Sequence, residues 1–373
     1  MRSKLIVLLV TVLCVVGGLS RYAMGDMIYT ETNSVGQNFI AAFQQDTESG
    51  ALTLQALYPT GGKGSPHFFG CSQDTIVSDG EFLYAVNVGS DDISIFRINS
   101  GGGLELLGIP VPSGGKVPIT LALKNGLLYV GNQGDGNKIP ANYTGFAVNN
   151  NGTLTPIPGS TVELNISPAP GPADLQFTAD GKFLIGSRVS DSAIDVFRVT
   201  SQGTIERTDQ LASPHPFGMA FNPVAPQQII ISLEALPGSA SFLFSGGQLT
   251  FLHEAVDDPA VDSCWIQIRK DGEFVWLSGF FGQSVTLHHL DKDGTLQPVS
   301  LHSTAPFGKF TSDILLDKRQ KFLYALLPGS SQLHIMRTTG ETSNGGLADV
   351  GTVALPANSL PQGLVLFTNR EGR

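Results

Sequence analysis

The fold is decided by residues 77–108, VSDGEFLYAVNVGSDDISIFRINSGGGLELLG. The stretch opens at the turn Asp79-Gly80, which leads into an apolar run over residues 82–88. Asp91-Asp92 then turns the chain into an alternating run over residues 93–98, and a glycine cluster precedes a third apolar run. Short runs of β-branched and aromatic residues between turn residues indicate the strands of an antiparallel sheet. One such sheet is not stable alone, so the rest of the chain must supply others.

Copies of this pattern recur along the chain, and each begins at a turn. The six opening turns lie at Asp79, Asn125, Asp180, Pro223, Asp271 and Asp317. Their spacings are 46, 55, 43, 48 and 46 residues. Because one four-stranded blade of a β-propeller takes about 40–50 residues, the period is that of a propeller.

The two ends of the chain complete the count. Near the start, the runs MIYTETNS, NFIAAFQQ and GALTLQAL match the second, third and fourth strands of a blade. The missing first strand is at the other end, where PQGLVL (361–366) matches PFGMAF (216–221). We therefore predict an all-β, seven-bladed β-propeller of four-stranded antiparallel blades, in which the C-terminal strand 360–367 pairs with the N-terminal strand 27–32. This closure hides two sheet edges.

Residues 1–25 have the pattern of a secretory signal peptide, with Arg2 and Lys4 before an apolar core and Ala23-Met24-Gly25 before Asp26. We expect this segment to be cleaved, which leaves residues 26–373 as a single secreted propeller domain. A signal anchor is the alternative, but the apolar run is short for a membrane span. No other segment is apolar enough to cross a bilayer.

Charge limits the partners. The formal net charge is −10, and the signal peptide carries three cations and no acid, so the mature chain is at about −13. A chain this acidic, with no basic run, is a poor binder of nucleic acid or anionic membranes. We expect a monomer that takes a small molecule at the mouth of its channel and needs no cofactor.

Three sequons and two cysteines suit a secreted protein. The sequons are at Asn142, Asn151 and Asn165, and we expect them to carry surface glycans if the host is eukaryotic. Cys71 and Cys264 remain after cleavage and could form a disulfide. They precede the first strands of blades nearly opposite each other, and a disulfide needs Cα atoms within about 7 Å. We therefore expect two separate thiols.

The internal repeat also locates a candidate site. In a propeller, the loops that enter the innermost strands share a face with the turns that leave the second strands, and both converge on the mouth of the channel. Two charged residues stand where most repeats have Asn or a small residue, namely Arg188 and Glu234. The other candidates for contact with a ligand at this mouth are His67, Asn87, Asn132, Asp174, His215, Trp265 and Asp313.

Several of these candidates have a structural alternative. Arg188 could form an ion pair with Glu234 or Asp174 that ties adjacent blades, because a lone buried charge is costly. His67 and His215 could be packing or hydrogen-bonding residues. Trp265 could belong to the core or form a stacking wall for a ligand.

The blade pattern resembles the lactonase family of seven-bladed propellers, which includes 6-phosphogluconolactonases and 3-carboxy-cis,cis-muconate cyclases. The resemblance is carried by VNVGSDDISIFRI at Val86, GPADLQFTADGKFL at Gly171, SPHPFGMAF at Ser213 and SCWIQIRKDGEFV at Ser263. It covers nearly all of the mature chain and implies the fold more strongly than the activity.

The resemblance also implies a catalytic pattern from which this chain departs. The family has Pro-Arg-His before a first strand and Asn-Glu at the end of the second strand of the same blade. Here Pro172-Ala173-Asp174 and Ser187-Arg188 stand at those places. A shifted site, with Glu234 as general base and with His215 and Arg188 polarising a lactone carbonyl, is chemically consistent.

Two classes of function follow. The first is metal-free hydrolysis or cycloisomerisation of a small lactone. The second is a non-catalytic secreted propeller that binds a ligand or a protein, as an antigen, adhesin or matrix component would. A third and weaker option is a Ca²⁺ site formed by Asn87, Asn132, Glu234 and Asp262, since oxygen ligands suit that ion.

Overall fold

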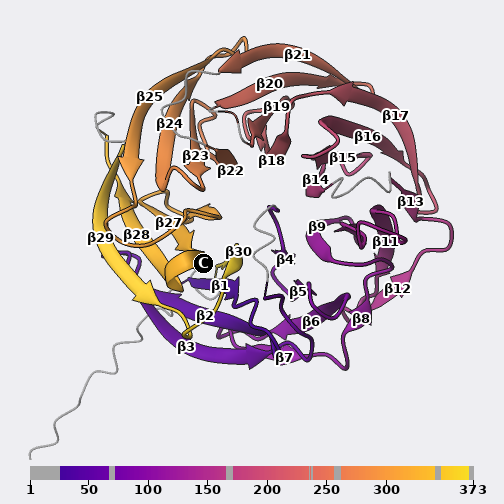
Figure 1. Ribbon diagram of the computed structural model, residues 1–373, viewed down its shortest axis with the longest axis horizontal. Coiled ribbons are helices and arrows are strands. Elements are labelled where there is room, and N and C mark those ends of the chain that lie inside the picture. Colours follow the sequence, from indigo (N-terminus) through magenta and orange to yellow (C-terminus); the bar gives the residue numbers. More distant parts are fainter. Residues whose placement is uncertain are drawn as a thin grey trace, which may run out of the picture.

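In this computed structural model the chain forms a ring of seven β-sheets around a central axis (Figure 1). The structure describes residues 26–66, 72–164, 171–234, 236, 238–255, 262–340 and 346–368. The expected signal peptide, residues 1–25, lies outside the described residues. Within them, no helix has the length and apolar character needed to span a membrane.

Each blade is a run of antiparallel strands that starts at the channel and ends at the outer rim. From the innermost strand outward, blade 1 contains β30 (Gln362–Phe367), β1 (Met27–Glu31), β2 (Phe39–Gln45) and β3 (Leu52–Pro59). Blade 2 contains β4 (Ile76–Ser78), β5 (Phe82–Asn87), β6 (Asp92–Ile98) and an outer strand in two pieces, β7 (Leu104–Leu106) and β8 (Val111–Pro112). Blade 3 contains β9 (Pro118–Lys124), β10 (Leu127–Asn132), β11 (Asn142–Val148), and the pieces β12 (Leu154–Pro156) and β13 (Val162–Glu163).

The remaining blades follow the same order. Blade 4 contains β14 (Pro172–Phe177), β15 (Phe183–Arg188), β16 (Ala193–Val199) and β17 (Ile205–Ala212). Blade 5 contains β18 (Pro216–Asn222), β19 (Ala225–Leu233), β20 (Gly238–Ser245) and β21 (Gln248–Ala255). Blade 6 contains β22 (Ser263–Ile268), β23 (Phe274–Gly279), β24 (Ser284–Leu290) and β25 (Leu296–Ser303). Blade 7 contains β26 (Ile314–Leu316), β27 (Phe322–Leu327), the short 3₁₀ helix η1 (Pro328–Ser330), β28 (Gln332–Thr338) and β29 (Leu347–Ala354).

The predicted closure of the ring is confirmed. Strand β30 pairs antiparallel with β1, with Met27 opposite Phe367 and Ile28 opposite Leu366. The C-terminal strand thus completes the blade that the N-terminal strands begin, and both edges of β1 are paired. The seven blades and their antiparallel order are those that the internal repeat predicts.

Apolar side chains fill the space between neighbouring blades, and a buried tyrosine recurs in that layer. In four blades the second strand carries a tyrosine whose hydroxyl donates to a glycine carbonyl in the outer turn of the next blade. These bonds are Tyr29 to Gly102 (2.6 Å), Tyr84 to Gly152 (2.9 Å), Tyr129 to Gly203 (2.7 Å) and Tyr324 to Gly50 (3.0 Å). They join blades 1 to 2, 2 to 3, 3 to 4 and 7 to 1.

Ser72 and Gln73, which precede the innermost strand β4 of blade 2, reach across the channel to other blades, and the repeat did not predict this. The backbone N–H of Gln73 donates to the carbonyl of Ala173 at 2.9 Å, in blade 4. The Gln73 side chain donates to the carbonyl of Met219 at 3.0 Å, in blade 5, and accepts from the backbone N–H of Ile266 at 3.1 Å, in blade 6. One glutamine therefore links three blades across the axis.

This crossing removes the basis for the expected separation of the two cysteines. The entrance of blade 2 does not lie far from blade 6, because Trp265 Nε1 donates to the carbonyl of Ser72 at 2.8 Å. The expectation of two separate thiols was based on that separation and stays a prediction. Cys71 lies outside the described residues, and Cys264 is buried.

Candidate functional site

The mouth of the channel is built from a repeated local structure. The residue before an innermost strand adopts a left-handed conformation, and its carbonyl accepts the N–H of the residue that follows the second strand. This occurs at Val117 (φ 58°), Gly171 (φ 47°), His215 (φ 43°) and Asp262 (φ 68°), with donors Gln133, Val189, Glu234 and Phe280 at 2.8 to 3.1 Å. The ladder between the innermost and second strands shifts register just beyond this point in each of these blades.

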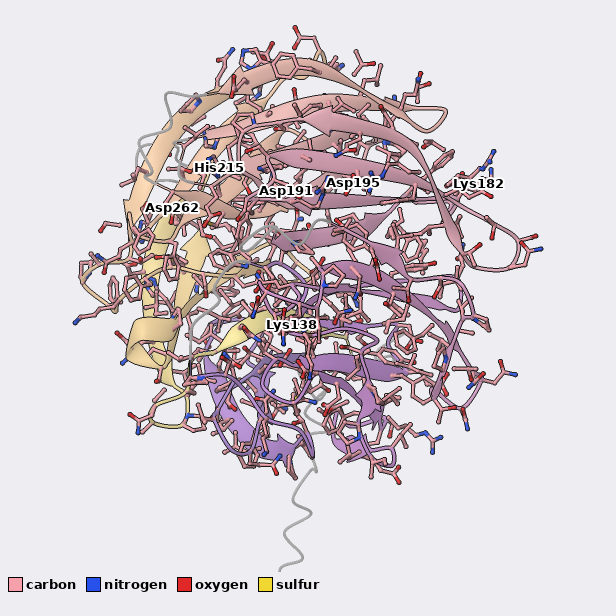
Figure 2. All side chains as sticks on the ribbon, turned by 45° about the vertical axis from the view of Figure 1, so that its right-hand side comes forward. Lys138, Lys182, Asp191, Asp195, His215 and Asp262 are labelled. Carbon is pink, nitrogen blue, oxygen red and sulfur yellow. The ribbon has the colours of Figure 1, made fainter. Side chains whose placement is uncertain are left out.

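Such conformations are uncommon for residues other than glycine, and they gather at functional sites. A bulge at the end of a strand redirects the side chains beside it. The sequence places His215 and Asp262 at equivalent positions of neighbouring blades, and the backbone bends there in the same way. Figure 2 labels both residues, and it shows Lys182 at the outer rim.

His215 and Glu234 lie together at the mouth of blade 5. The N–H of Glu234 donates to the carbonyl of His215 at 2.8 Å. The His215 side chain is exposed, and that of Glu234 is partly buried. The predicted acid and imidazole therefore come from adjacent backbone positions on one blade, with access to solvent.

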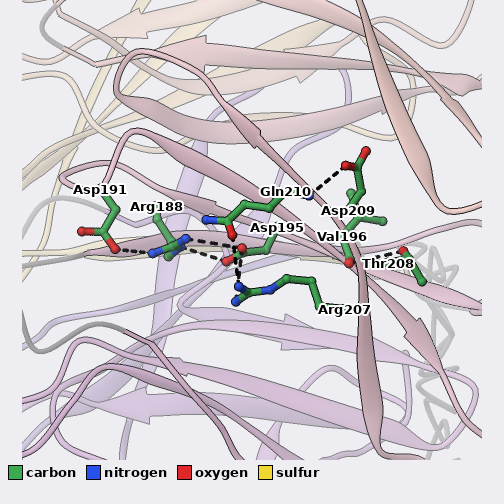
Figure 3. A network of polar contacts seen from close by, with 8 residues as sticks. All are labelled: Arg188, Asp191, Asp195, Val196, Arg207, Thr208, Asp209 and Gln210. Atoms are coloured by element: carbon green, nitrogen blue, oxygen red, sulfur yellow. Dashed lines mark hydrogen bonds and ion pairs between the residues drawn. The ribbon is translucent and has the colours of Figure 1, made fainter.

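Arg188 is placed differently (Figure 3). Its guanidinium is 3% exposed and forms ion pairs with Asp191 and with Asp195, whose Oδ2 lies 2.8 Å from Nε. Arg207 reaches the other oxygen of Asp195 at 3.4 Å. Arg188 thus forms a structural ion pair, as its alternative role requires, but its partners are Asp191 and Asp195 of the hairpin that follows it. A guanidinium held by two carboxylates is a poor electrophile for a substrate.

Asp174 and Asp313 lie inside the channel beside the crossing segment, near Asp74. Burial raises the pKa of Asp174 and that of Asp313 well above the usual range, and the charge of Asp74 adds to both shifts. Burial also raises the pKa of Asp74 to about 7, although Gln176 Nε2 donates to it at 2.6 Å. Asp174 accepts the N–H of Met219, and Asp313 that of Leu364, each at 2.8 Å.

Asn87 and Asn132 are fully buried and serve the packing between blades. Asn87 donates to Asp92 and Ser94 at 2.7 Å each and accepts from Thr60 at 2.7 Å. A Cβ at Gly62 would overlap the Asn87 side chain, and one at Gly115 would overlap Asn132. The predicted role of both asparagines in ligand contact therefore does not fit their burial.

Asn132 donates instead to Asn142 at 2.9 Å. The two asparagines expected in a calcium site are thus engaged in separate networks of blades 2 and 3. In the part of the chain that the structure describes, no group of three acidic, histidine or cysteine side chains is arranged to hold a metal ion.

Trp265 belongs to the core, which is one of its two predicted placements. It is 2% exposed and packs edge-on against Phe217, with ring centroids 5.0 Å apart. Since its Nε1 is bonded to the Ser72 carbonyl, the indole fixes the crossing segment. His67 lies outside the described residues.

The sequons divide. Asn142 is 5% exposed and its amide is bonded to Asn132 and, at 3.4 Å, to the carbonyl of Gly114, so the expected surface glycan does not fit its burial. Asn151 is exposed in the turn before β12, which fits an acceptor. Asn165 lies outside the described residues.

Sequence reasoning missed Asp74 and Gln73, and the reason is physical. Both lie in the connection between β3 and β4, which has no counterpart in the repeat. Two signals were present: 16 residues separate β3 from β4, and β4 has only three residues, whereas three residues separate β17 from β18. When a long connection leads into a short innermost strand, some of its residues are free to lie in the channel.

The architecture and its mouth define the class of the protein, a seven-bladed propeller that presents polar groups at one end of a filled channel. The family model described as lactonase, 7-bladed beta-propeller, matches residues 37–157. The resemblance to the lactonase family is thereby confirmed. No curated protein matches the chain significantly in sequence.

Solved structures agree on the fold. Periplasmic gluconolactonase PpgL of Pseudomonas aeruginosa is similar with a TM-score of 0.76 at 16% identity, over 93% of this chain and 99% of that one. A protein of Bacteroides fragilis described as a candidate 6-phosphogluconolactonase is similar with a TM-score of 0.77 at 18% identity, over 93% and 99%. Identities this low carry the architecture and not the substrate.

Proposed function

We propose that the protein is a secreted, metal-free hydrolase of small lactones that works at the mouth of blade 5. One observation supports the proposal above others: the backbone hydrogen bond from Glu234 N–H to the His215 carbonyl, which holds the residues that carry a carboxylate and an exposed imidazole next to each other at the mouth of blade 5. The lactonase-type fold agrees with it. Export, through cleavage before Asp26, and a glycan on Asn151 are parts of the same proposal.

The chemistry can be written from these two side chains. The Glu234 carboxylate takes a proton from water while the water oxygen bonds to the lactone carbonyl carbon. The His215 imidazole donates a hydrogen bond to the carbonyl oxygen as it gains charge. The ring C–O bond then breaks, Glu234 returns its proton to the leaving oxygen, and a hydroxy acid is released. Arg188 serves as a positioning residue that holds the turn before β16. A cycloisomerisation would use the same carboxylate as the base.

A non-catalytic binding propeller is the second candidate, and a specific observation favours it. The residues at the family's catalytic places are engaged elsewhere, because Asp174 is buried against Met219 and Arg188 is paired with two acids. Under this alternative the mouth of blade 5 would bind a ligand without turnover.

A panel of lactones separates the two candidates. Purified protein is assayed with δ-valerolactone, glucono-δ-lactone, dihydrocoumarin and 6-phosphogluconolactone, beside Glu234→Gln and His215→Gln. Loss of one general base lowers turnover by about 10²–10⁴-fold, so Glu234→Gln should fall in that range with its melting temperature nearly unchanged. Wild-type protein that leaves all four lactones at the background rate would overturn the hydrolase proposal.

A further inference from the structure

Three phenylalanines, of which Phe280 and Phe310 are partly buried and Phe281 is exposed, form an aromatic ridge on the mouth face between blades 6 and 7. The rings of Phe280 and Phe310 stack at 4.7 Å with an interplanar angle of 7°. Phe281 stands edge-on to both, at 5.0 Å and 6.0 Å. Its side chain is 65% exposed, so the ridge presents an open aromatic surface.

These residues depart from the repeat in the way that the site residues do. The equivalent turns of blades 2, 4 and 7 contain no aromatic residue, namely Val88-Gly89-Ser90-Asp91, Val189-Ser190-Asp191-Ser192 and Pro328-Gly329-Ser330-Ser331. Blade 6 has Phe280-Phe281-Gly282-Gln283. Phe310 is also held in the left-handed conformation, at φ 62°, which is unfavourable for a bulky residue. Packing alone does not require an aromatic residue at the tip of an exposed turn.

The ridge is connected to the candidate site through the backbone. Phe280 N–H donates to the carbonyl of Asp262 at 3.1 Å, and Asp262 is the blade 6 counterpart of His215. Beneath the ridge, Phe280 contacts Trp265 at 6.1 Å between centroids. The aromatic ridge and the His215–Glu234 pair therefore lie on neighbouring blades of one face.

Charge on this side of the mouth selects against anionic ligands. Among the described residues of the mouth-face loops from blade 4 to blade 7, there is one lysine or arginine, Lys309. The same loops carry the acids Asp191, Glu234 and Asp262. Arg188, at the end of β15, is already paired with Asp191 and Asp195. Phosphate recognition needs free cations or converging N–H donors, and like charges oppose association.

We infer that this site takes uncharged lactones that carry an aromatic group, which stacks on Phe281 and Phe310, and that it discriminates against phosphorylated sugar lactones. The inference rests on the proposed function for its lactone, while the aromatic subsite is a separate binding claim. Aromatic pairs prefer offset or edge-on geometry at ring separations of about 4.5–7 Å, which an exposed edge-on ring can provide to a ligand.

Two readouts test the inference. The first is the ratio of kcat/KM for dihydrocoumarin to that for δ-valerolactone, which differ in the aromatic ring. An aromatic contact adds roughly 2- to 10-fold in affinity beyond area burial, so Phe281→Ser should lower this ratio by about 5-fold or more. Phe251→Ser is the matched control, because Phe251 is 53% exposed on β21, away from the mouth. An unchanged ratio in Phe281→Ser would overturn the inference.

The second readout does not need turnover. Binding of the stable lactam 3,4-dihydroquinolin-2-one is measured by calorimetry, and Phe281→Ser should weaken it while Glu234→Gln retains it. If all lactones fail as substrates but the lactam binds in this pattern, the aromatic subsite stands and the hydrolase proposal fails. If lactones are hydrolysed but 6-phosphogluconolactone is preferred, the hydrolase proposal stands and the inference fails.

Discussion

Two sides of the ring are built differently. Blades 7, 1, 2 and 3 are each tied to the next blade by a buried tyrosine, and the second strands of blades 2 and 3 end in the buried asparagines Asn87 and Asn132. In blades 4, 5 and 6 the tyrosine position holds Ile185, Ile230 and Trp276. Arg188 ends the second strand of blade 4, and Glu234 and Phe280 directly follow the second strands of blades 5 and 6.

In the first group of blades the repeated residues serve packing, and in the second group other residues have replaced them. One side keeps neutral side chains covered by glycine loops, as at Gly62 and Gly115. The other side brings His215, Glu234 and Phe281 to the mouth and holds Arg188 in an ion-pair network. Departures from local rules are expected at functional sites, and here they gather on one side of one face.

The largest effect on stability is expected at the ion-pair network of blade 4. Arg188→Ala leaves Asp195, which is fully buried, without its closest cation. Breaking a buried pair by removing one partner costs about 3–5 kcal/mol. Urea unfolding measures this loss of stability, and the double variant Arg188→Ala/Asp195→Asn should regain part of it. A cost below about 1 kcal/mol would mean that Arg188 is not the structural residue of this side, by the same scale.

The channel acids come next, and they predict lower stability at alkaline pH. The pKa of Asp74 is raised to about 7, so the folded state keeps a proton that the unfolded chain has lost. The unfolded chain therefore binds fewer protons between about pH 4 and pH 7, and stability falls as pH rises through this window. We expect a loss of about 1–3 kcal/mol from pH 5 to pH 8, allowing for the partial exposure of Asp74.

Urea midpoints at the two pH values measure this loss. Asp74→Asn should flatten the dependence and raise stability at pH 8, while Glu105→Gln, at an exposed position of the outer strand β7, is the surface control. Greater stability of the wild-type protein at pH 8 than at pH 5 would contradict the placement of these acids.

Smaller effects are expected from the tyrosine ties. Tyr84→Phe and Tyr129→Phe each remove one buried hydrogen bond, which contributes about 0.5–1.5 kcal/mol. The corresponding bonds of the other side come from shorter side chains, Thr208 to Gly247 at 2.8 Å and Ser241 to Gly294 at 2.6 Å. None of these changes should alter lactone turnover per folded molecule. Assays in which each variant is used at the same concentration of folded protein check this.

Much of this architecture could be predicted from the sequence, because a repeat states the same structure several times. Seven blades, their antiparallel order and the pairing of β30 with β1 follow from the period and from PQGLVL at residues 361–366. The proximity of His215 and Glu234 follows as well, since both stand at fixed positions of one blade.

What could not be predicted depends on single contacts between distant segments. The crossing of the channel by Ser72 and Gln73 lies in a connection outside the repeat, and it decides the surroundings of Asp174 and Asp313. The ion-pair partners of Arg188 differ from those expected, because Asp191 and Asp195 of its own hairpin reach the guanidinium. Asn142 carries a sequon, but its strand position buries it.

Hydrogen exchange with and without 3,4-dihydroquinolin-2-one tests most directly whether blades 4 to 6 form the working side. We predict slower exchange in peptides that contain His215, Glu234 and Phe281, and no change in peptides that contain Asn87 or Asn132. Protection confined to the peptides around Asn87 and Asn132 would contradict the assignment of the site.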